Sequence, residues 1–298
     1  MIDLHIHTTN SDGTCTVKEI LEIAEEKKLE WISITDHESC KSYEELRNDE
    51  IRKIFSGKII PGVELKSIYN GRVIDILGYD IDTEKMQKCI NEFYAENTRK
   101  EMQTKYLKKQ YEGALSLGLK LVPIDEIKWN PEKDWASVII YEEIGKLEEN
   151  RKKFPEFIWE KFDNFKQNYC QDINSPFYID KSSDYPSINQ TIEMIHKCGG
   201  KAFLAHAFIY KWAENKEKFI MDIIENYGID GVECYYSKFT EENIAMIEEI
   251  TKETGKYRSG GTDYHGEHSL GIELGIGKGN LRIETKNTIE EWYKKEGI

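Results

Sequence analysis

Strand-like and helix-like segments alternate along both ends of the chain, and this alternation limits the fold more than any other feature. Residues 2–6 alternate apolar and polar side chains, a pattern typical of a short strand. Thr16 and Glu19 then form a capping box that opens a helix. Further strands are expected at residues 31–35, 58–65 and 72–81. This β-α-β rhythm predicts an α/β fold with parallel strands and helices packed outside them.

The rhythm stops over residues 83–186 and then resumes. The interrupting stretch is highly charged and rich in aromatic residues, and its pattern is mostly helical with irregular connections. Strands are expected again at residues 201–208 and 230–236. We therefore predict one α/β domain formed by residues 1–82 and 187–298, with residues 83–186 as a helical insertion or cap subdomain.

Charge limits the classes of partner. Acidic residues outnumber basic ones, 55 against 41, which gives a formal net charge of −14. Proteins that bind long nucleic acids usually present a basic track that displaces counterions. The acid excess therefore argues against a long nucleic-acid groove, and it agrees with a site that binds cations.

Cysteine usage and hydropathy bear on the compartment. The six cysteines are scattered without a C-x-x-C pair, a pattern typical of reduced thiols rather than of a disulfide or zinc framework. The sequence opens without a basic-then-apolar signal segment, and no apolar run approaches the roughly 20 residues of a bilayer span. We therefore expect a cytoplasmic protein that does not enter the membrane, and nothing in the sequence fixes its oligomeric state.

Histidines and acidic residues gather where predicted strands end. The residues concerned are His5, His7 and Asp12 near the end of the first strand, His37 after the second, Glu64 at the end of the third, His206 near the end of the strand that follows the insertion, and Asp263 and His265 at the last. Residues two apart on a strand point to one face, and the carboxyl ends of parallel strands converge on a common mouth. Imidazole and carboxylate groups gathered in this way suit zinc, manganese or iron, and a mixed set can hold more than one ion.

Each of these histidines taken alone would more often be a buried structural group or a solvated one. Five of the seven histidines, however, share the strand-end position beside acidic groups, which makes coincidence a poor explanation. The other two do not share it. His196 is expected to be structural, and His268 is expected to be solvated.

Five motifs together resemble the PHP family, which is named for its polymerase and histidinol phosphatase members. The motifs are HIHTTNSDGT, ITDHES, PGVEL, GGKAFLAHAF and GTDYHG, and they stand in the family's order over about residues 1–82 and 187–285. SDGT, GIDGVECYY and GTDYHG most resemble the TrpH-like branch. Members of that branch act on nucleoside 3′,5′-bisphosphates and short 5′-phosphorylated oligonucleotides.

The resemblance implies a distorted (β/α)7 barrel with two or three divalent ions. It assigns one ion to His5, His7, Glu64 and Asp263, a second to Glu64, His206 and the residue eleven past Glu64, and a third to Asp12, His37 and His265. The residue eleven past Glu64 is Asp75, where the family usually has histidine. An oxygen ligand in place of nitrogen shifts the preference toward harder ions such as manganese. The alternative is that Asp75 is an ordinary strand residue and the second ion is weak or absent.

The insertion departs from the branch in a second way, which concerns the substrate. The branch commonly carries a phosphate-gripping arginine motif there, whereas residues 134–144 read DWASVIIYEEI. Lys66, two past Glu64 on the same strand face, and Arg258 are the candidate substrate-binding cations. The aromatic residues of the insertion suit a subdomain core or a surface that stacks on a base.

These inferences predict a metal-dependent phosphoesterase that hydrolyses a small phosphorylated substrate, such as a nucleoside bisphosphate, a nucleotide or a short 5′-phosphorylated oligonucleotide. A metal-activated hydroxide is expected to attack phosphorus, with Asp12, His37, Glu64, His206 and Asp263 as the catalytic set. Histidinol-phosphate phosphatase and an amidohydrolase acting on a C–N bond are the alternatives. A metal-stabilised binding module without catalysis is a third, which the nearly complete ligand set disfavours.

Overall fold

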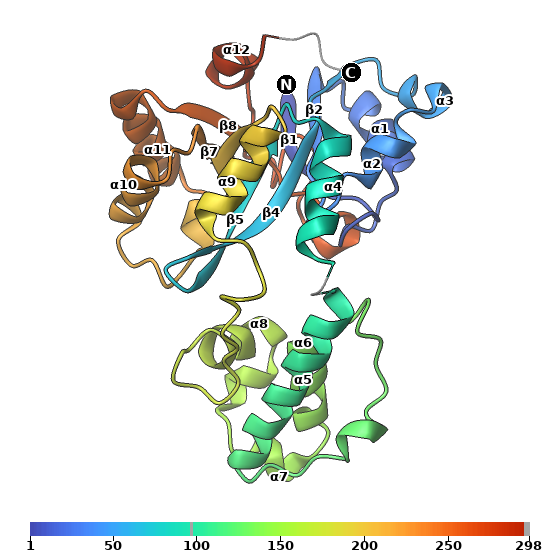
Figure 1. Ribbon diagram of the computed structural model, residues 1–298, viewed down its shortest axis with the longest axis vertical. Helices are drawn as coiled ribbons and strands as arrows, with labels where there is room; N and C mark the ends of the chain where they lie inside the picture. Colours follow the sequence, from blue (N-terminus) through green and yellow to red (C-terminus); the bar gives the residue numbers. More distant parts are fainter. Residues whose placement is uncertain (96–97, 295–298) are drawn as a thin grey trace. The chain divides into compact units, whose positions relative to one another are not determined.

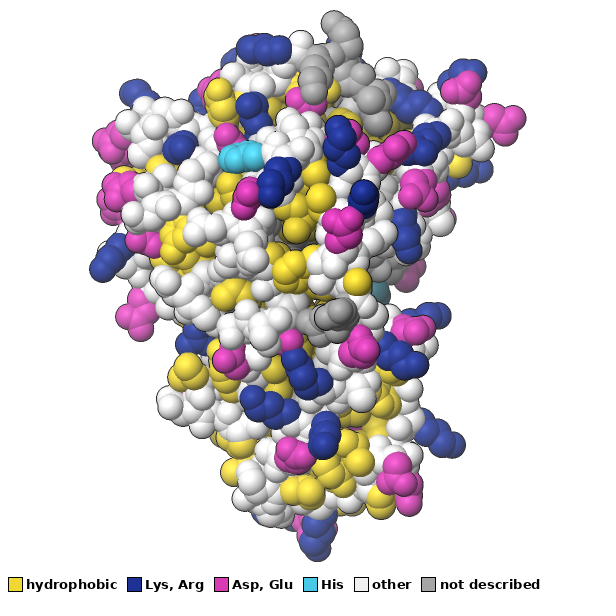
Figure 2. All heavy atoms as spheres, in the orientation of Figure 1, with side chains coloured by type: hydrophobic (Ala, Val, Ile, Leu, Met, Phe, Trp, Pro, Cys, Tyr) yellow, Lys and Arg dark blue, Asp and Glu magenta, His cyan; other side chains and the backbone are white. Residues whose placement is uncertain are grey.

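The computed structural model describes residues 1–95 and 98–294 and divides the chain into two compact units (Figure 1). The first unit contains Met1–Glu92 and Tyr185–Ile298, and the second contains Phe93–Asp184. Among the described residues, none of the helices combines the length and apolar composition that a bilayer crossing requires. Figure 2 shows acidic and basic side chains interspersed over the face in view.

The first unit is an α/β structure with two sheets. The first sheet is parallel, with the order β1-β2-β3, and consists of β1 (Ile2–Ile6), β2 (Trp31–Ile34) and β3 (Lys58–Ile59). The second sheet has the order β4-β5-β6-β7-β8 and consists of β4 (Gly62–Tyr69), β5 (Arg72–Tyr79), β6 (Lys201–Leu204), β7 (Gly231–Tyr236) and β8 (Tyr257–Gly261). The strand expected over residues 58–65 is broken between β3 and β4, where Pro61 has no N–H to donate to a ladder.

The expectation of parallel strands throughout was wrong for β5. This strand runs antiparallel to both of its neighbours, β4 and β6, whereas β6, β7 and β8 are mutually parallel. Asn70 and Gly71 form the two-residue loop between β4 and β5, and both have positive φ, 48° and 73°. An Asn-Gly pair in this conformation is the preferred connection of a tight hairpin, so no helix separates these strands.

Main-chain hydrogen bonds join the edges of the two sheets at two places. Where β1 meets the end of β8, His7 N–H donates to the carbonyl of Tyr264 at 2.9 Å, and Asp263 N–H donates to the carbonyl of His5 at 2.9 Å. Beyond β2, Glu38 N–H donates to the carbonyl of Glu64 on β4 at 2.9 Å. The ends of several strands from both sheets are thereby drawn into one region.

Helices cover the sheets of the first unit. They are α1 (Val17–Glu26), α2 (Lys41–Glu45), α3 (Asp49–Arg52), α4 (Thr83–Phe93), α9 (Ile188–Lys197), α10 (Lys216–Asn226), α11 (Glu241–Thr254) and α12 (Ile289–Trp292). The expected capping box at Thr16 and Glu19 is present at the start of α1. Helix α9 contacts β4, β5 and β6, and α11 contacts β7 and β8 (Figure 1). Buried Leu4, Leu77 and Phe203 belong to the apolar core of this unit.

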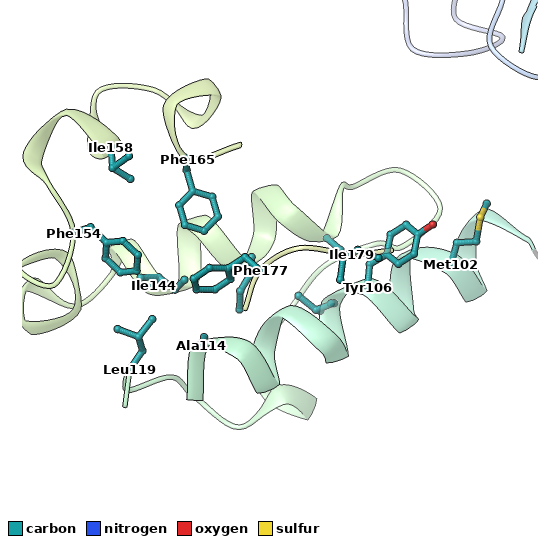
Figure 3. Packing of buried hydrophobic residues seen from close by; sticks show 13 residues of the cluster. Met102, Tyr106, Ala114, Leu119, Ile144, Phe154, Ile158, Phe165, Phe177 and Ile179 are labelled. Carbon is teal, nitrogen blue, oxygen red and sulfur yellow. The ribbon is translucent and has the colours of Figure 1, made fainter. Parts of the chain in front are cut away.

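The second unit is helical and has its own core. It contains α5 (Arg99–Ser116), α6 (Ala136–Gly145), α7 (Glu148–Arg151) and α8 (Phe162–Phe165). Phe154, Phe165 and Phe177 pack against one another in its interior (Figure 3). Trp135 and Phe157 differ from these, with 37% and 44% of their surface exposed. Most aromatic side chains of this unit therefore serve packing.

Candidate metal centre

Strand ends carry nearly all of the predicted ligands into one buried cluster. His5 lies in β1 and His7 one residue beyond it, Glu64 lies in β4, and His206 and Asp263 follow β6 and β8 by two residues each. His5, His7 and Glu64 are fully buried, and His206 is 4% exposed. Ionisable side chains are rarely buried to this extent unless they are paired or hold a metal.

One group of four contains His5, His7, Glu64 and Asp263, whose potential ligand atoms all lie within 4.8 Å of one another. Glu64 Oε2 lies 3.1 Å from Nε2 of both His5 and His7. Asp263 Oδ1 lies 3.5 Å from His5 Nε2 and 3.3 Å from His7 Nε2. Two imidazoles and two carboxylates facing a common centre make a donor set typical of a divalent transition metal.

A second group contains His7, Asp12, His37 and His265, again with potential ligand atoms within 4.8 Å. Asp12 Oδ1 lies 3.2 Å from His265 Nε2, and Asp12 Oδ2 lies 3.7 Å from His37 Nε2. His7 takes part in both groups, because its Nδ1 faces Asp12 Oδ1 at 3.8 Å while its Nε2 faces Glu64. A neutral imidazole has one lone-pair nitrogen, so His7 can ligate an ion in only one of the two groups.

A third group contains His37, Glu64 and Asp75. His206 also contacts Glu64, with 3.0 Å between His206 Nε2 and Glu64 Oε1. Asp75 is held by Tyr210, whose hydroxyl accepts from the Asp75 N–H at 2.7 Å and donates to Asp75 Oδ2 at 3.3 Å. This group thus brings together the carboxylates of the expected second set.

Unusual backbone conformations occur at three residues of this region. His206, Asp263 and Glu38 have φ values of 28°, 56° and 46°, in the left-handed region that non-glycine residues rarely adopt. Each such residue costs of order 1–3 kcal/mol, and such residues cluster at functional sites. The fold tolerates this strain where it directs the side chains into the cluster.

The charge state of the cluster favours cations. Burial raises the pKa of the Glu64 carboxyl, but the neighbouring His5 and His37 imidazoles outweigh burial and hold that pKa well below its usual range. Burial likewise raises the pKa of Asp263, and His5 and His7 hold it well below its usual range. Burial lowers the pKa of His7, but the close carboxylates of Asp263 and Glu64 raise it to about 10. The buried carboxylates are therefore charged and require positive partners.

Several potential metal-ligand atoms of the cluster have no hydrogen-bond partner among the described residues. They are buried and comprise His7 Nδ1 and Nε2, Asp12 Oδ1, Asp75 Oδ1 and His206 Nδ1. A buried polar atom without a partner costs about 1–3 kcal/mol, which ligation of a metal would recover. His7 and Asp12 belong to the first two groups, so the residues present fit divalent ions there.

A model of the family described as the PHP domain matches residues 3–175, more than half of the chain. The chain belongs to the PHP domain family. Members of this family are metal-dependent phosphoesterases, so the protein is a hydrolase of phosphoric esters. Its buried histidine and carboxylate groups agree with the metal binding of such domains.

Relatives of this PHP protein include enzymes that act on nucleotides. The 5′-3′ exoribonuclease Rnm of Escherichia coli strain K12 is 26% identical over 284 residues, covering 92% of this chain and 87% of that protein. The 3′,5′-nucleoside bisphosphate phosphatase of Chromobacterium violaceum is 22% identical, covering 92% of this chain and 90% of that protein.

Solved structures show the same fold. A metal-dependent phosphoesterase from Bifidobacterium adolescentis matches with a TM-score of 0.64 at 18% identity, over 100% of this chain and 96% of that one. An amidohydrolase from Chromobacterium violaceum with bound sulfate matches with a TM-score of 0.61 at 18% identity, over 89% of this chain and 87% of that one.

Sequence reasoning missed Glu233 of this PHP domain. Glu233 is fully buried in β7, where its Oε1 lies 2.8 Å from His5 Nδ1 and its Oε2 accepts from the His206 N–H at 2.7 Å. A carboxylate that orients a ligating histidine is common in metal sites. Tyr236 was also missed, and its hydroxyl donates to Asp263 Oδ2 at 2.9 Å. The signal in the sequence was an isolated acidic residue in the apolar strand segment GVECYY.

The two predicted substrate-binding cations have different locations. Lys66 Nζ lies 3.3 Å from His37 Nδ1, at the border of the cluster. Burial lowers the pKa of the Lys66 amine, but the carboxylates of Glu38 and Asp75 outweigh burial and raise it. Arg258 does not join the cluster, because it lies near the start of β8 and forms an ion pair with Glu291. Arg258 stands five positions before Asp263, and its role as a substrate-binding cation stays a prediction.

The remaining histidines lie outside the three groups. His196 is exposed near the end of α9, where its Nε2 lies 2.7 Å from Asp230 Oδ2. His268 is also exposed, and its Nδ1 lies 3.0 Å from the carbonyl oxygen of Asp12. His196 thus has a structural contact, and His268 borders the cluster without entering it.

Proposed function

We propose that this phosphoesterase hydrolyses the phosphate ester of a small phosphorylated substrate, namely a nucleoside bisphosphate, a nucleotide or a short 5′-phosphorylated oligonucleotide. The observation that carries the proposal is the convergence of buried imidazoles and carboxylates from five strand ends on one region. The exoribonuclease and bisphosphate phosphatase relatives support this substrate class.

The proposed ligands are His5, His7, Glu64 and Asp263 for one ion and Asp12, His37 and His265 for another, with Glu64, His206 and Asp75 as the set that a further ion would need. Manganese, zinc or iron would suit these donors. Bound ions of this kind neutralise charge on phosphate oxygens and activate a water molecule for in-line attack on phosphorus. The catalytic residues proposed are Asp12, His37, Glu64, His206 and Asp263.

The chain's own residues position this machinery. Glu233 fixes the ring of His5 through Nδ1 and the backbone of His206 through its N–H. The Tyr236 hydroxyl fixes one oxygen of Asp263 and leaves Oδ1 directed at His5 and His7. Lys66 is the proposed substrate-binding cation, because a protonated amine beside His37 lies within reach of a phosphate held there.

Three features of organisation belong to the same proposal. The two sheets, joined at their edges near His7 and Glu64, form the distorted barrel of the PHP type. A helical insertion, expected over residues 83–186, interrupts the barrel domain of residues 1–82 and 187–298, and the compact helical unit Phe93–Asp184 supports it. The enzyme acts in the reducing cytoplasm, as the six free cysteines suggest.

The test measures hydrolysis of a panel of substrates by protein loaded with manganese. Inorganic phosphate is measured for the phosphomonoesters, released nucleotides for the oligonucleotide, and released amine for the amide. The panel contains a nucleoside 3′,5′-bisphosphate, a short 5′-phosphorylated oligoribonucleotide, histidinol phosphate and an amide substrate. We expect activity on the nucleotides that a chelator removes and manganese restores. Hydrolysis that survives removal of the metal, or activity confined to histidinol phosphate or the amide, would contradict the proposal.

A further inference from the structure

Lys66 lies directly opposite Asp75 in the β4–β5 hairpin, where the two residues are register partners. Directly opposite residues of an antiparallel pair project from the same face of a sheet, with Cβ atoms about 4.5–5.5 Å apart. Lys66 also shares that face with Glu64, two residues before it on β4. Asp75, which stands where the family usually has histidine, therefore faces Lys66.

The Lys66 ammonium borders the third group of potential metal ligands. Its Nζ lies 3.3 Å from His37 Nδ1. The carboxylate oxygen Oε2 of Glu64 lies 3.4 Å from the same His37 nitrogen. An ammonium in this position repels a divalent ion and supplies positive charge to Glu64 and Asp75. Among the described residues it forms no ion pair with either carboxylate, so it acts on them through space, as a nearby positive charge.

His37 is also unable to serve an ion there. Its Nε2 faces Asp12 in the second group, and a neutral imidazole offers a lone pair from only one nitrogen. If Nε2 ligates, Nδ1 carries hydrogen, and its acceptor is Glu64 Oε2 at 3.4 Å rather than the Lys66 ammonium, which can only donate. The third group then keeps the carboxylates of Glu64 and Asp75 but loses His37 as a nitrogen ligand. His206, which contacts Glu64, is the nitrogen ligand that remains nearby.

Glu38 holds Lys66 in place. The Glu38 carboxylate accepts from the Lys66 main-chain N–H at 2.7 Å through Oε1, and its Oε2 lies 3.8 Å from Nζ. The Lys66 and Glu38 side chains are only 18% and 21% exposed, respectively. Glu38 itself adopts a left-handed backbone conformation with φ of 46°. This arrangement fixes the ammonium close to the cluster.

We propose that the Lys66 ammonium takes the place of one divalent ion beside Glu64 and Asp75, so that the centre binds two ions per chain rather than three. The inference rests on the metal centre of the proposed function. The two ions would occupy the His5–Glu64–Asp263 and Asp12–His37–His265 positions. Asp75 would then be the counter-ion of a lysine, which explains why a carboxylate stands opposite Lys66.

The experiment measures bound manganese per chain at saturation, by elemental analysis and by native mass spectrometry. We expect two ions in the unaltered protein, three in Lys66→Met, which removes the cation but keeps much of the side-chain volume, and two in Lys66→Arg, which keeps the charge. Lys41→Met, at an exposed position on α2, is the matched control and should bind two. Circular dichroism would verify that each variant is folded.

Three ions in the unaltered protein, or two in folded Lys66→Met, would overturn the inference. If Lys66→Met does not fold, the count in the unaltered protein still decides, because two supports the inference and three refutes it. Failure of the proposed function is a separate result. Two bound ions without hydrolysis of any substrate in the panel would refute the function alone. Three ions with chelator-sensitive hydrolysis would refute only the inference about Lys66.

Discussion

Replacing Glu233 by glutamine tests whether a carboxylate behind the ligands sets the affinity of the centre. Glu233 serves two donors at once, the His5 ring at 2.8 Å and the His206 N–H at 2.7 Å. Glutamine has nearly the same shape but only one accepting atom, so either donor loses its acceptor in Glu233→Gln. His5 also loses the negative charge that makes its ring a stronger ligand.

The size of the effect follows from these contacts. A buried donor without an acceptor costs about 1–3 kcal/mol, and 1.4 kcal/mol corresponds to a factor of about 10 in affinity. We therefore expect Glu233→Gln to weaken manganese binding by about 10- to 100-fold, which is the range typical of carboxylates that support metal ligands.

Titration of the metal-free protein with manganese, in competition with a chelating dye, measures this change. Glu248→Gln is the matched control, because Glu248 lies on α11, accepts a hydrogen bond from the Tyr235 hydroxyl at 2.7 Å and belongs to none of the three groups of potential ligands. Its affinity for manganese should stay within about twofold of the unaltered value. If Glu233→Gln also stays within twofold while folded, the role assigned to Glu233 is refuted.

Three further predictions concern stability. In the metal-free protein, the pKa of His7 is raised to about 10, so protonation of His7 stabilises the folded state. This contribution is complete below about pH 6.5 and is lost as the pH rises toward 10. The free energy of unfolding from urea melts should therefore fall over that window, and a constant value would contradict the prediction. Gly261→Ala should destabilise the protein by at least about 1–3 kcal/mol in the same melts, because the new Cβ would lie 2.3 Å from His5 N; an unchanged midpoint would contradict the close approach of β1 and β8. Manganese should slow hydrogen exchange at the His7 and Asp263 amides more than at amides of α5, and equal protection at both would contradict a coupling between metal and sheet edges.

Much of the metal centre was predictable because its ligands follow strands. His5 and His7 lie at the end of an alternating segment, and period-two geometry alone requires that they point to one side. Asp263 follows the same logic beyond β8, whereas Glu64, which was expected at the end of a strand, lies near the start of β4. The structure gathers potential ligand atoms of all four within 4.8 Å of one another. Local pattern therefore identified these residues although their partners lie far away in the sequence.

The hairpin escaped prediction because a strand pattern carries no direction. Residues 58–65 and 72–81 both look like strands, and the β-α-β rhythm around them suggested parallel pairing. The Asn70-Gly71 pair was the only local signal that the chain turns back. Missing it concealed that Lys66 and Asp75 are register partners.

Glu233 and Arg258 show a different limit. An acidic residue in an apolar strand looks the same in sequence whether it faces solvent or contacts a buried histidine. Glu233 contacts His5, which lies 228 positions earlier in the chain. Arg258 was a candidate because it precedes a ligand motif, but in the structure its guanidinium pairs with Glu291. In both cases long-range contacts, not local pattern, decide which charges meet.

The proposed ligands divide between the two sheets, so bound ions would have a structural role as well as a chemical one. His5 and His7 belong to β1 and its end in the first sheet, whereas Glu64 belongs to the second sheet and Asp263 follows its last strand. The main-chain bonds that join the sheets, from His7 to Tyr264 and from Asp263 to His5, are formed by the ligands themselves or their neighbours. An ion that draws these four side chains together therefore also favours the pairing of the sheet edges, because it binds the joined state and not the separated one. Conversely, any substitution that loosens this junction must weaken metal binding, even where it touches no ligand.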